Sequence, residues 1–501
     1  MGEKYQAFLE RTSTINHLSA AAGLLGWDQQ VMMPPGGTPA RAAQMAALST
    51  IIHEMTISEE TQRLLEDAAA EMQGVDYASD EASNIRVMQE NLRLLLKLPT
   101  AFVAEMVHHT SLAHDVWAKA RATNDFAAFA PTLTRQMDMA RQAAEYLGYD
   151  ENPYDALLGQ YEYGLKSAQV RAIFEGHKPQ LVELIAAIRE VTDRVDDSVL
   201  HQHYPVEQQR EFGLRIIKAF GFDFERGRQD VSVHPFASGS SPLDVRITTR
   251  FEANFLNPAL FGLMHESGHG MYDQGIPVHL MGQPIGNAIS LSIHESQSRL
   301  WENVVGRSRG FWQWAFPQLQ AIFPGQVGGV DMDTFYKAVN KSQPSFIRVE
   351  ADEATYNLHI MLRFELEDDL MNDRVKVNDL PRIWNERFEA SFGLVPPTDS
   401  LGVLQDVHWS AGLVGYFPTY ALGNLLSVQF YNEALKAHPG IPTEITEGKF
   451  DTLLGWLREN IHHHGCKFTM PELVERVTGQ QIDSRPYIAY LKAKYGEIYG
   501  L

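Results

Sequence analysis

The chain has 501 residues, of which 44% are hydrophobic and 21% are charged. This composition is typical of a folded globular protein and excludes an intrinsically disordered chain. The formal net charge of -21 disfavours nucleic acids and anionic membranes as partners, because no basic surface is available to displace counterions from phosphates.

The N-terminal residues lack the features of an exported protein. Met1-Gly2-Glu3 leads into a mixed polar helical pattern without the apolar segment of a signal peptide. No apolar run approaches the roughly 20 residues that are needed to span a bilayer. Cys466 is the only cysteine, which excludes an internal disulfide and is typical of a reducing compartment. We therefore expect a cytoplasmic protein.

Most of the chain shows the 3.6-residue apolar period of amphipathic helices, for example from Ile173 to Val191. Pro99 marks the break between one helix and the next. No long Gly/Ser/Pro-rich linker, low-complexity tract or repeat separates one part of the chain from another. The sequence therefore predicts a mainly α protein with a single large helical domain over residues 1–501.

A short β-rich region interrupts the helical pattern between Asp230 and Phe251. Residues 231–233 and 245–249 are rich in β-branched side chains, and the Ser/Gly-rich stretch 237–241 lies between them. This arrangement predicts a small hairpin or sheet near the active site, with residues 231–233 and 245–249 as two of its strands.

A metal-binding motif, His265-Glu266-Ser267-Gly268-His269, lies inside a predicted helix over residues 257–272. Two histidines four residues apart share one helix face, so both imidazoles can reach one zinc ion. Glu266 borders the metal without binding it, which is the position of a general base. An ordinary polar helix face is the alternative interpretation of these five residues.

A third ligand follows the motif in a second predicted helix. Catalytic zinc normally binds three protein ligands and keeps its fourth position open, and Glu295 completes a His, His, Glu set. His294 competes with it, but neighbouring helix residues diverge by roughly 100 degrees, so only one of the two can face the metal. We favour Glu295. Asp273 is either a carboxylate that orients an imidazole or a solvated acid near a helix end.

Two other polar tracts carry less functional weight. The acidic run Glu365-Leu366-Glu367-Asp368-Asp369 is interpreted as a solvated helix face. His462-His463-His464 lacks a spaced set of partner ligands, so we interpret it as a surface or interface feature rather than a metal site.

Six motifs in this sequence resemble those of the carboxypeptidase Taq family, also called the thermostable carboxypeptidase 1 family. The resemblance covers essentially the whole chain. The motifs are His234-Pro235-Phe236, Asp244-Val245-Arg246-Ile247-Thr248, the HEXXH at 265–269, His294-Glu295-Ser296-Gln297-Ser298-Arg299, Ile347-Arg348-Val349-Glu350-Ala351-Asp352 and Gly402-Val403-Leu404-Gln405-Asp406-Val407-His408-Trp409.

This resemblance implies a nearly all-helical, homodimeric zinc peptidase with a deep groove and a neurolysin-like architecture. It implies a carboxypeptidase with broad specificity that removes residues from peptides with a free C-terminus. In related zinc peptidases a His and a Tyr flank the scissile carbonyl, and His408 and Tyr420 are the candidates here. A buried aromatic side chain with a satisfied hydroxyl is the alternative for Tyr420.

Recognition of a free carboxylate calls for an arginine, whose planar fork can bind both oxygens. Arg348 is the first candidate and Arg246 the second, although either could pair with a structural acid such as Asp352 or Asp244. His234 and Gln405 are further candidates for substrate binding, and a structural imidazole is the alternative for His234.

Two other functions remain open. An endo-acting oligopeptidase would use the same zinc chemistry without an anchor for the terminal carboxylate. A catalytically silent scaffold would bind zinc and hydrolyse nothing, but Glu266 argues against it because a structural site needs no general base. We expect one zinc per chain, and Co²⁺ or Mn²⁺ could occupy the same ligands.

Overall fold

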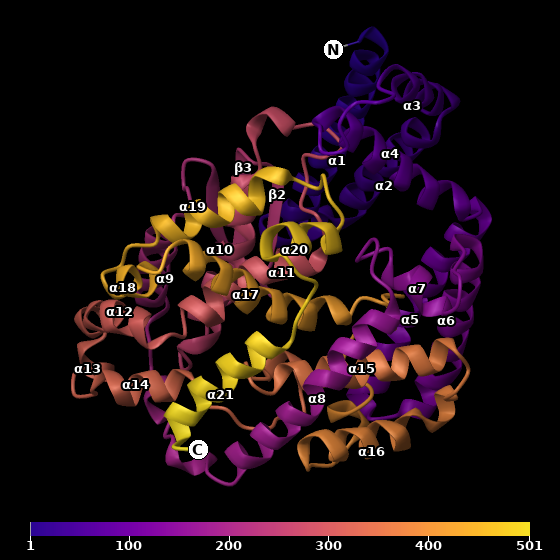
Figure 1. Cartoon of the computed structure of the whole chain (residues 1–501). Coiled ribbons are helices and arrows are strands. Elements are labelled where there is room, and N and C mark those ends of the chain that lie inside the picture. Colours follow the sequence, from indigo (N-terminus) through magenta and orange to yellow (C-terminus); the bar gives the residue numbers. More distant parts are fainter. Residues whose placement is uncertain (1) are drawn as a thin grey trace. The chain divides into compact units, whose positions relative to one another are not determined.

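The computed structural model describes residues 2–501 and is mostly helical, with one three-stranded sheet (Figure 1). The predicted mainly α fold class is therefore confirmed. The chain divides into two compact units. Unit 1 comprises Met1–Leu96, Asp197–Val339 and Phe430–Gly479, and unit 2 comprises the remaining segments. Among the described residues, no helix is both long enough and apolar enough to cross a bilayer.

Unit 1 begins with a group of long helices and continues with the helices that carry the metal motif. Side chains of α1, α3 and α4 form a local core that includes Phe8, Leu65 and Met88. The helices of unit 1 are α1 (Glu3–Val31), α2 (Thr38–Ile57), α3 (Glu59–Glu71), α4 (Asp80–Lys97), α9 (Val206–Phe220), α10 (Asn257–Gly275), α11 (Leu291–Arg299), α12 (Arg309–Ile322), α13 (Pro324–Val327), α14 (Met332–Val339), α18 (Ile441–Thr446), α19 (Asp451–Asn460) and α20 (Met470–Thr478). Short 3₁₀ turns lie at η1 (Pro35–Gly37), η3 (Ser198–His201), η4 (Val278–Leu280) and η9 (His462–His464), and η5 (Leu300–Val305) is a π-helix.

The sheet of unit 1 supports the helix that carries the metal motif. Its strands are β1 (Gly227–Val231), β2 (Ala237–Ser241) and β3 (Asp244–Thr249), in the order β1-β3-β2. Val245 and Ile247 of the central strand are fully buried, and α10 packs against β3. A Cβ at Gly270 of α10 would lie 3.2 Å from Ile247, so a glycine permits this close approach of helix and sheet.

The strand pairing differs from the predicted hairpin. β1 ends at Val231 and pairs with β3 in parallel, whereas β2, the stretch expected to be the turn, pairs with β3 antiparallel. β-Propensity reflects how well side chains pack, and β2 lies at an edge of the sheet, where backbone hydrogen bonds suffice for pairing. A Ser/Gly-rich strand of this kind gives no side-chain signal in the sequence.

Unit 2 is built around one helix that is buried on almost every side. α15 (Tyr356–Met371) packs against α6, α7, α8 and α16, and 14 of its residues are buried. The other helices of unit 2 are α5 (Thr100–Thr123), α6 (Phe126–Leu147), α7 (Pro153–Leu158), α8 (Ser167–Arg189), α16 (Leu380–Phe392) and α21 (Arg485–Tyr499). α17 (Pro418–Ala437) contains the boundary between the units at residues 429 and 430, and 3₁₀ turns lie at η2 (Thr192–Arg194), η6 (Arg348–Glu350), η7 (Val377–Asp379) and η8 (Asp399–Leu401).

The acidic run on α15 is not the solvated face that the sequence predicted. Glu367 and Asp368 are buried. Glu367 accepts hydrogen bonds from the Tyr154 hydroxyl at 2.8 Å, from the Trp409 indole N–H at 2.9 Å and from the Gly415 amide at 3.0 Å. The prediction was wrong because these donors come from segments far away in the chain, which a local charge pattern does not reveal.

The histidine tract is also only partly at the surface. His463 is exposed, but His462 is fully buried and its Nε2 lies 2.9 Å from Oε1 of Gln297. Gln297 is two residues after Glu295, so His462 packs behind the helix that carries the predicted third ligand. The tract is therefore in part an internal support of α11.

Candidate metal centre

The three predicted ligands converge on one point in unit 1. Nε2 of His265 and Nε2 of His269 each lie 3.5 Å from Oε2 of Glu295. Donor atoms around a tetrahedral zinc, with bonds of about 2.0–2.2 Å, are themselves separated by about 3.3–3.5 Å. One nitrogen or oxygen from each of the three residues lies within 4.8 Å of the other two. The donor set and its spacing therefore fit a divalent metal ion.

Local sequence explains how the two helices come so close together. Gly268, inside the motif, faces α11, and a Cβ there would lie 2.6 Å from the backbone oxygen of Gln297 and 2.6 Å from Cα of Ser298. Only a glycine fits this contact between the backbones. α11 begins after Ser290, whose side chain accepts a hydrogen bond from the Ile293 amide and caps the helix. Together these features bring Glu295 to the histidines of α10.

Each ligand imidazole has a hydrogen-bond partner on its other nitrogen. Nδ1 of His265 lies 2.8 Å from Oε2 of Glu302. Nδ1 of His269 lies 2.5 Å from Nδ1 of His294, whose Nε2 is 3.1 Å from Oδ1 of Asp273. His294 is therefore not part of the convergent ligand set. It contacts His269 from behind, and Asp273 in turn contacts His294.

The charges around the ligands favour a cation. Burial opposes ionisation of Glu302, but Arg299 and His265 lower its pKa to about 2. Burial also opposes protonation of His265, yet Glu295 and Glu302 raise its pKa to about 9. Burial and His294 lower the pKa of His269 to about 4. The two carboxylates thus concentrate negative charge on both sides of His265.

Glu266 lies between the two ligand histidines in the sequence and is 7% exposed. Burial raises its pKa to about 7, against the opposing effect of His265. Glu266 is therefore a buried acid on the same helix as both histidines.

In unit 2, Arg348 belongs to a buried cluster of charges. Its Nη2 lies 2.8 Å from Oδ1 of Asp406, and its Nη1 donates to the Tyr356 hydroxyl at 2.9 Å. Arg363 contacts the same aspartate, with Nε donating to Oδ2 at 2.6 Å. Gln405 accepts a hydrogen bond from the Arg348 amide at 2.8 Å. Gln405 therefore holds the backbone of Arg348 in place.

His408 and Tyr420 also meet in unit 2. Nε2 of His408 lies 3.3 Å from the Tyr420 hydroxyl, and the Arg348 guanidinium lies 5.1 Å from the centre of the Tyr420 ring. Burial lowers the pKa of His408 to about 4, so the imidazole is neutral at neutral pH. Three candidate site residues from the sequence, Arg348, His408 and Tyr420, are therefore neighbours.

The two remaining candidates lie near the sheet of unit 1. Arg246 makes a two-pronged ion pair with Asp244, with both N–O distances at 2.9 Å, and lies 4.4 Å from the Trp27 ring. This pairing is the structural alternative that the sequence left open. His234 is exposed, and its backbone oxygen accepts a hydrogen bond from Ser232 at 2.6 Å.

Some residues of these clusters were missed by the sequence analysis. Glu302 had a signal, because it follows Glu295 by seven residues, which is two helical turns, and therefore recurs near the same face. Arg363 had none, since its partner Asp406 is 43 residues away along the chain.

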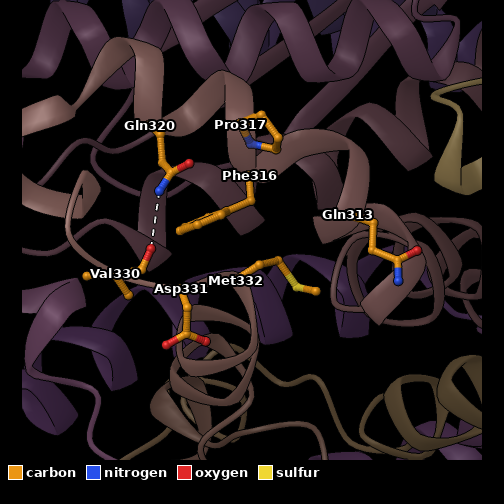
Figure 2. Close-up of a pocket in the computed structure, with 7 residues that line it drawn as sticks. All are labelled: Gln313, Phe316, Pro317, Gln320, Val330, Asp331 and Met332. Carbon is orange, nitrogen blue, oxygen red and sulfur yellow. Dashed lines mark hydrogen bonds between the residues drawn. The ribbon is translucent and has the colours of Figure 1, made fainter.

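A separate pocket in unit 1 lies between α12 and the residues that precede and begin α14 (Figure 2). Its lining residues are Gln313, Phe316, Pro317, Gln320, Val330, Asp331 and Met332. The Gln320 side chain donates a hydrogen bond to the backbone oxygen of Val330 at 3.2 Å, as Figure 2 shows. None of the predicted site residues lines this pocket, so it is distinct from the metal centre.

Comparison with known proteins gives matches along nearly the entire chain. The model of the family described as carboxypeptidase Taq (M32) metallopeptidase matches residues 7–495. Thermostable carboxypeptidase 1 of Thermus thermophilus is 41% identical over 99% of both chains, and carboxypeptidase 1 of Bacillus subtilis is 35% identical over 98% of both.

Solved structures give the same result. The M32 carboxypeptidase from Deinococcus radiodurans superimposes with a TM-score of 0.97 at 38% identity and covers 100% of both chains. A carboxypeptidase from Pyrococcus furiosus gives a TM-score of 0.94 at 36% identity and covers 99% of both. Sequence and fold therefore point to the same group of proteins.

Proposed function

This chain belongs to the carboxypeptidase Taq family of metallopeptidases, and from that premise we propose that it is a zinc-dependent carboxypeptidase with broad side-chain specificity. Members of this family are peptide hydrolases that act as exopeptidases. The observation that carries the proposal is the convergence of His265, His269 and Glu295 on one point, with Glu266 on the same helix. This donor set leaves a fourth coordination position for water or substrate.

Zinc is the metal that we propose, one ion per chain, held by His265, His269 and Glu295. Two imidazoles and one carboxylate form the ligand set of a common class of catalytic zinc sites. When bound, the ion lowers the pKa of water and polarises the scissile carbonyl. Co²⁺ or Mn²⁺ would fit the same ligands, because selectivity among these ions also depends on geometry and availability.

Glu266 is proposed as the proton shuttle. In this role its carboxylate accepts a proton from the attacking water and passes it to the amine of the departing residue. Its support is its position next to His265 and its burial among the ligand side chains. No other acid lies between the two ligand histidines in the motif.

His408 and Tyr420 are proposed as donors that stabilise the oxyanion of the transition state. A hydroxyl and a neutral imidazole can both donate a hydrogen bond to such an oxygen. Their support is the contact between His408 Nε2 and the Tyr420 hydroxyl, together with the lowered pKa of His408.

Arg348 is proposed as the anchor of the substrate's terminal carboxylate. Arg348 and Arg363 share the single carboxylate of Asp406, so this buried group has one more positive than negative charge. A buried excess of positive charge favours an anion. Arg246, His234 and Gln405 are the further candidates for substrate contact, although the fork of Arg246 already binds Asp244.

A peptide pair tests the function directly. One peptide has a free C-terminus and its twin is amidated, and each is incubated with the zinc-loaded enzyme and with Glu266→Gln while mass spectrometry follows the products. We expect stepwise loss from the free C-terminus only, and almost none with the variant. Internal cuts in both peptides would establish the alternative, an endo-acting oligopeptidase. No cleavage by the zinc-loaded wild type would establish the silent scaffold.

We also propose a homodimer that acts in the cytoplasm, where thiols stay reduced. The support for the compartment is the single cysteine, Cys466, which is free. Light scattering coupled to size-exclusion chromatography should give twice the 56.4 kDa of one chain. A mass of one chain at micromolar concentration would contradict the dimer.

A further inference from the structure

The two ligand histidines are supported by chemically different partners. His265 contacts a carboxylate directly, since its Nδ1 lies 2.8 Å from Glu302. His269 contacts another imidazole, that of His294, at 2.5 Å, and the carboxylate of Asp273 lies one step further away. Imidazoles that bind a metal usually donate their second N–H to a carboxylate, a carbonyl or water, so the partner of His269 is unusual.

The contacts of Glu302 tie it to the third ligand. Arg299 donates through Nε to Oε1 of Glu295 at 2.7 Å and through Nη1 to Oε2 of Glu302 at 3.2 Å. Arg307 adds a second cation, with Nη2 at 3.8 Å from Oε1 of Glu302. One guanidinium thus connects the ligand carboxylate to the carboxylate that holds His265.

The backbone around Glu302 is also specialised. α11 passes directly into η5, the π-helix Leu300–Val305, which contains Glu302. π-Helical turns are rare and are often found at functional sites. The side chains of Glu302 and Arg299 are only 12% and 15% exposed, so little water competes for their contacts.

The contacts from His269 through His294 to Asp273 determine which ring nitrogens carry protons when the metal is bound. When a metal ion occupies Nε2 of His269, Nδ1 of the same ring carries the proton and donates it to Nδ1 of His294. His294 then carries its own proton on Nε2 and donates it to Asp273, four residues after His269. His269 is therefore held by a neutral acceptor, whereas His265 is held by an anion.

We propose that Glu302, fixed by Arg299, and the His294–Asp273 pair are positioning residues that hold the two metal-binding imidazoles with unequal strength. An anionic partner makes an imidazole a stronger donor than a neutral one does. The Glu302 contact therefore contributes more to metal retention than the His294 contact. This inference rests on the proposed metal site, but its test measures metal release and needs no peptide.

The experiment compares zinc release from the full-length holoenzyme after mixing with an excess of chelator. Glu302→Gln keeps an oxygen that can accept the His265 proton but removes the charge, and we expect zinc release to be about 10–100-fold faster. Asp273→Asn should accelerate release by less than tenfold. Asp333→Asn is the matched control, because Asp333 is an acid of unit 1 that pairs with Arg309 and Lys337 and has no contact with the proposed metal ligands among the described residues. This control should release zinc at the wild-type rate.

Two further measurements separate positioning from general stability. The melting temperature of Glu302→Gln should fall further in the zinc-loaded form than in the zinc-free form, where only the lost pairing with Arg299 and Arg307 acts. The visible spectrum of the Co²⁺-loaded variant should shift, because the ligand field of His265 changes. Arg299→Lys, which cannot contact both carboxylates, should give an intermediate release rate and serves as the second variant if Glu302→Gln does not fold.

Three results would overturn the proposal. The first is a zinc-release rate within twofold of wild type for Glu302→Gln or, if that variant does not fold, for Arg299→Lys. The second is a larger increase in the release rate for Asp273→Asn than for Glu302→Gln. The third is an equal fall in the melting temperature of Glu302→Gln with and without zinc. A wild type that retains zinc but leaves the free-terminus peptide uncut would contradict the carboxypeptidase instead and leave this inference standing.

Discussion

Buried polar groups are arranged in opposite ways in the two units. In unit 1 the donor atoms of His265, His269 and Glu295 converge on a common point, and each residue is held from behind by another polar side chain. In unit 2 the carboxylate of Asp406 is bound on both oxygens by Arg348 and Arg363. The first arrangement leaves binding capacity for a cation, whereas the second satisfies its anion internally.

The difference shows what each cluster requires. A metal site needs donor atoms held close together from different helices, so its geometry depends on supporting contacts and on the packing of α10 against α11. In the charge cluster of unit 2 the one carboxylate is paired with both arginines, because an unpaired ion in a protein interior is strongly unfavourable, and the cluster keeps one net positive charge. Burial opposes ionisation of Asp406, but the two arginines hold its pKa well below its usual range.

Removing the shared anion of unit 2 should have the largest effect on stability. Asp406→Asn leaves Arg348 and Arg363 buried without a countercharge, and we expect a loss of about 3–5 kcal/mol in the free energy of unfolding. Urea denaturation measures it. Glu386→Gln on α16, which removes the exposed pair with Arg382, is the control and should cost less than about 0.5 kcal/mol. Similar losses for the two variants would mean that Asp406 is not needed to balance the arginines.

Glu367, also in unit 2, predicts a pH dependence. Burial raises its pKa from 4.5 to about 7, although its three hydrogen-bond donors oppose the shift. The folded state therefore holds a proton that the unfolded state has already lost between pH 4.5 and 7. The contribution of Glu367 to the free energy of unfolding is complete below about pH 4.5. It falls by about 3 kcal/mol as the pH rises from 4.5 to about 7.

A variant on the same helix isolates this contribution. Glu367→Gln does not ionise, so the difference in unfolding free energy between wild type and variant should change across this pH window. Glu365→Gln is the matched control, because Glu365 lies two residues away, pairs with Lys178 and is only partly buried. Urea denaturation of all three proteins at pH 5 and pH 8 measures this change. An equal change in the free energy of unfolding for wild type and Glu367→Gln would refute the raised pKa of Glu367.

The convergence of His265, His269 and Glu295 could be predicted from the sequence because their geometry is local. His265 and His269 are one helical turn apart, and Glu295 lies on the next α-helix along the chain. The helix boundary at Pro99 and the helix around the motif were predicted for the same reason, and they correspond to the start of α5 at Thr100 and to α10.

The errors share one physical cause, which is pairing between distant segments. The sheet was expected to be a hairpin, but β1 joins β3 in parallel and the Ser/Gly-rich β2 occupies an edge. Glu367 was expected in solvent, but donors from residues 154, 409 and 415 surround it. Hydrogen-bond partners that are brought together only by folding have no signature in a local pattern.

The smallest expected effect on stability tests how closely α10 must approach α11. Gly268→Ala places a Cβ 2.6 Å from the Gln297 oxygen, a distance that real Cβ atoms do not show, so the two helices must separate. Overpacking of this kind typically costs about 1–3 kcal/mol. The separation would also move Glu295 away from the histidines, so zinc should dissociate faster while the helical circular dichroism signal stays near wild type.

Gly26→Ala on α1 is the matched control, since a Cβ there meets no atom within 4 Å. In a helix, alanine is favoured over glycine by about 1 kcal/mol, so this variant should be slightly more stable than wild type and should retain zinc normally. If Gly268→Ala behaved in the same way, the close contact between the helices would not determine the ligand geometry, and side-chain support alone would hold the three donors together.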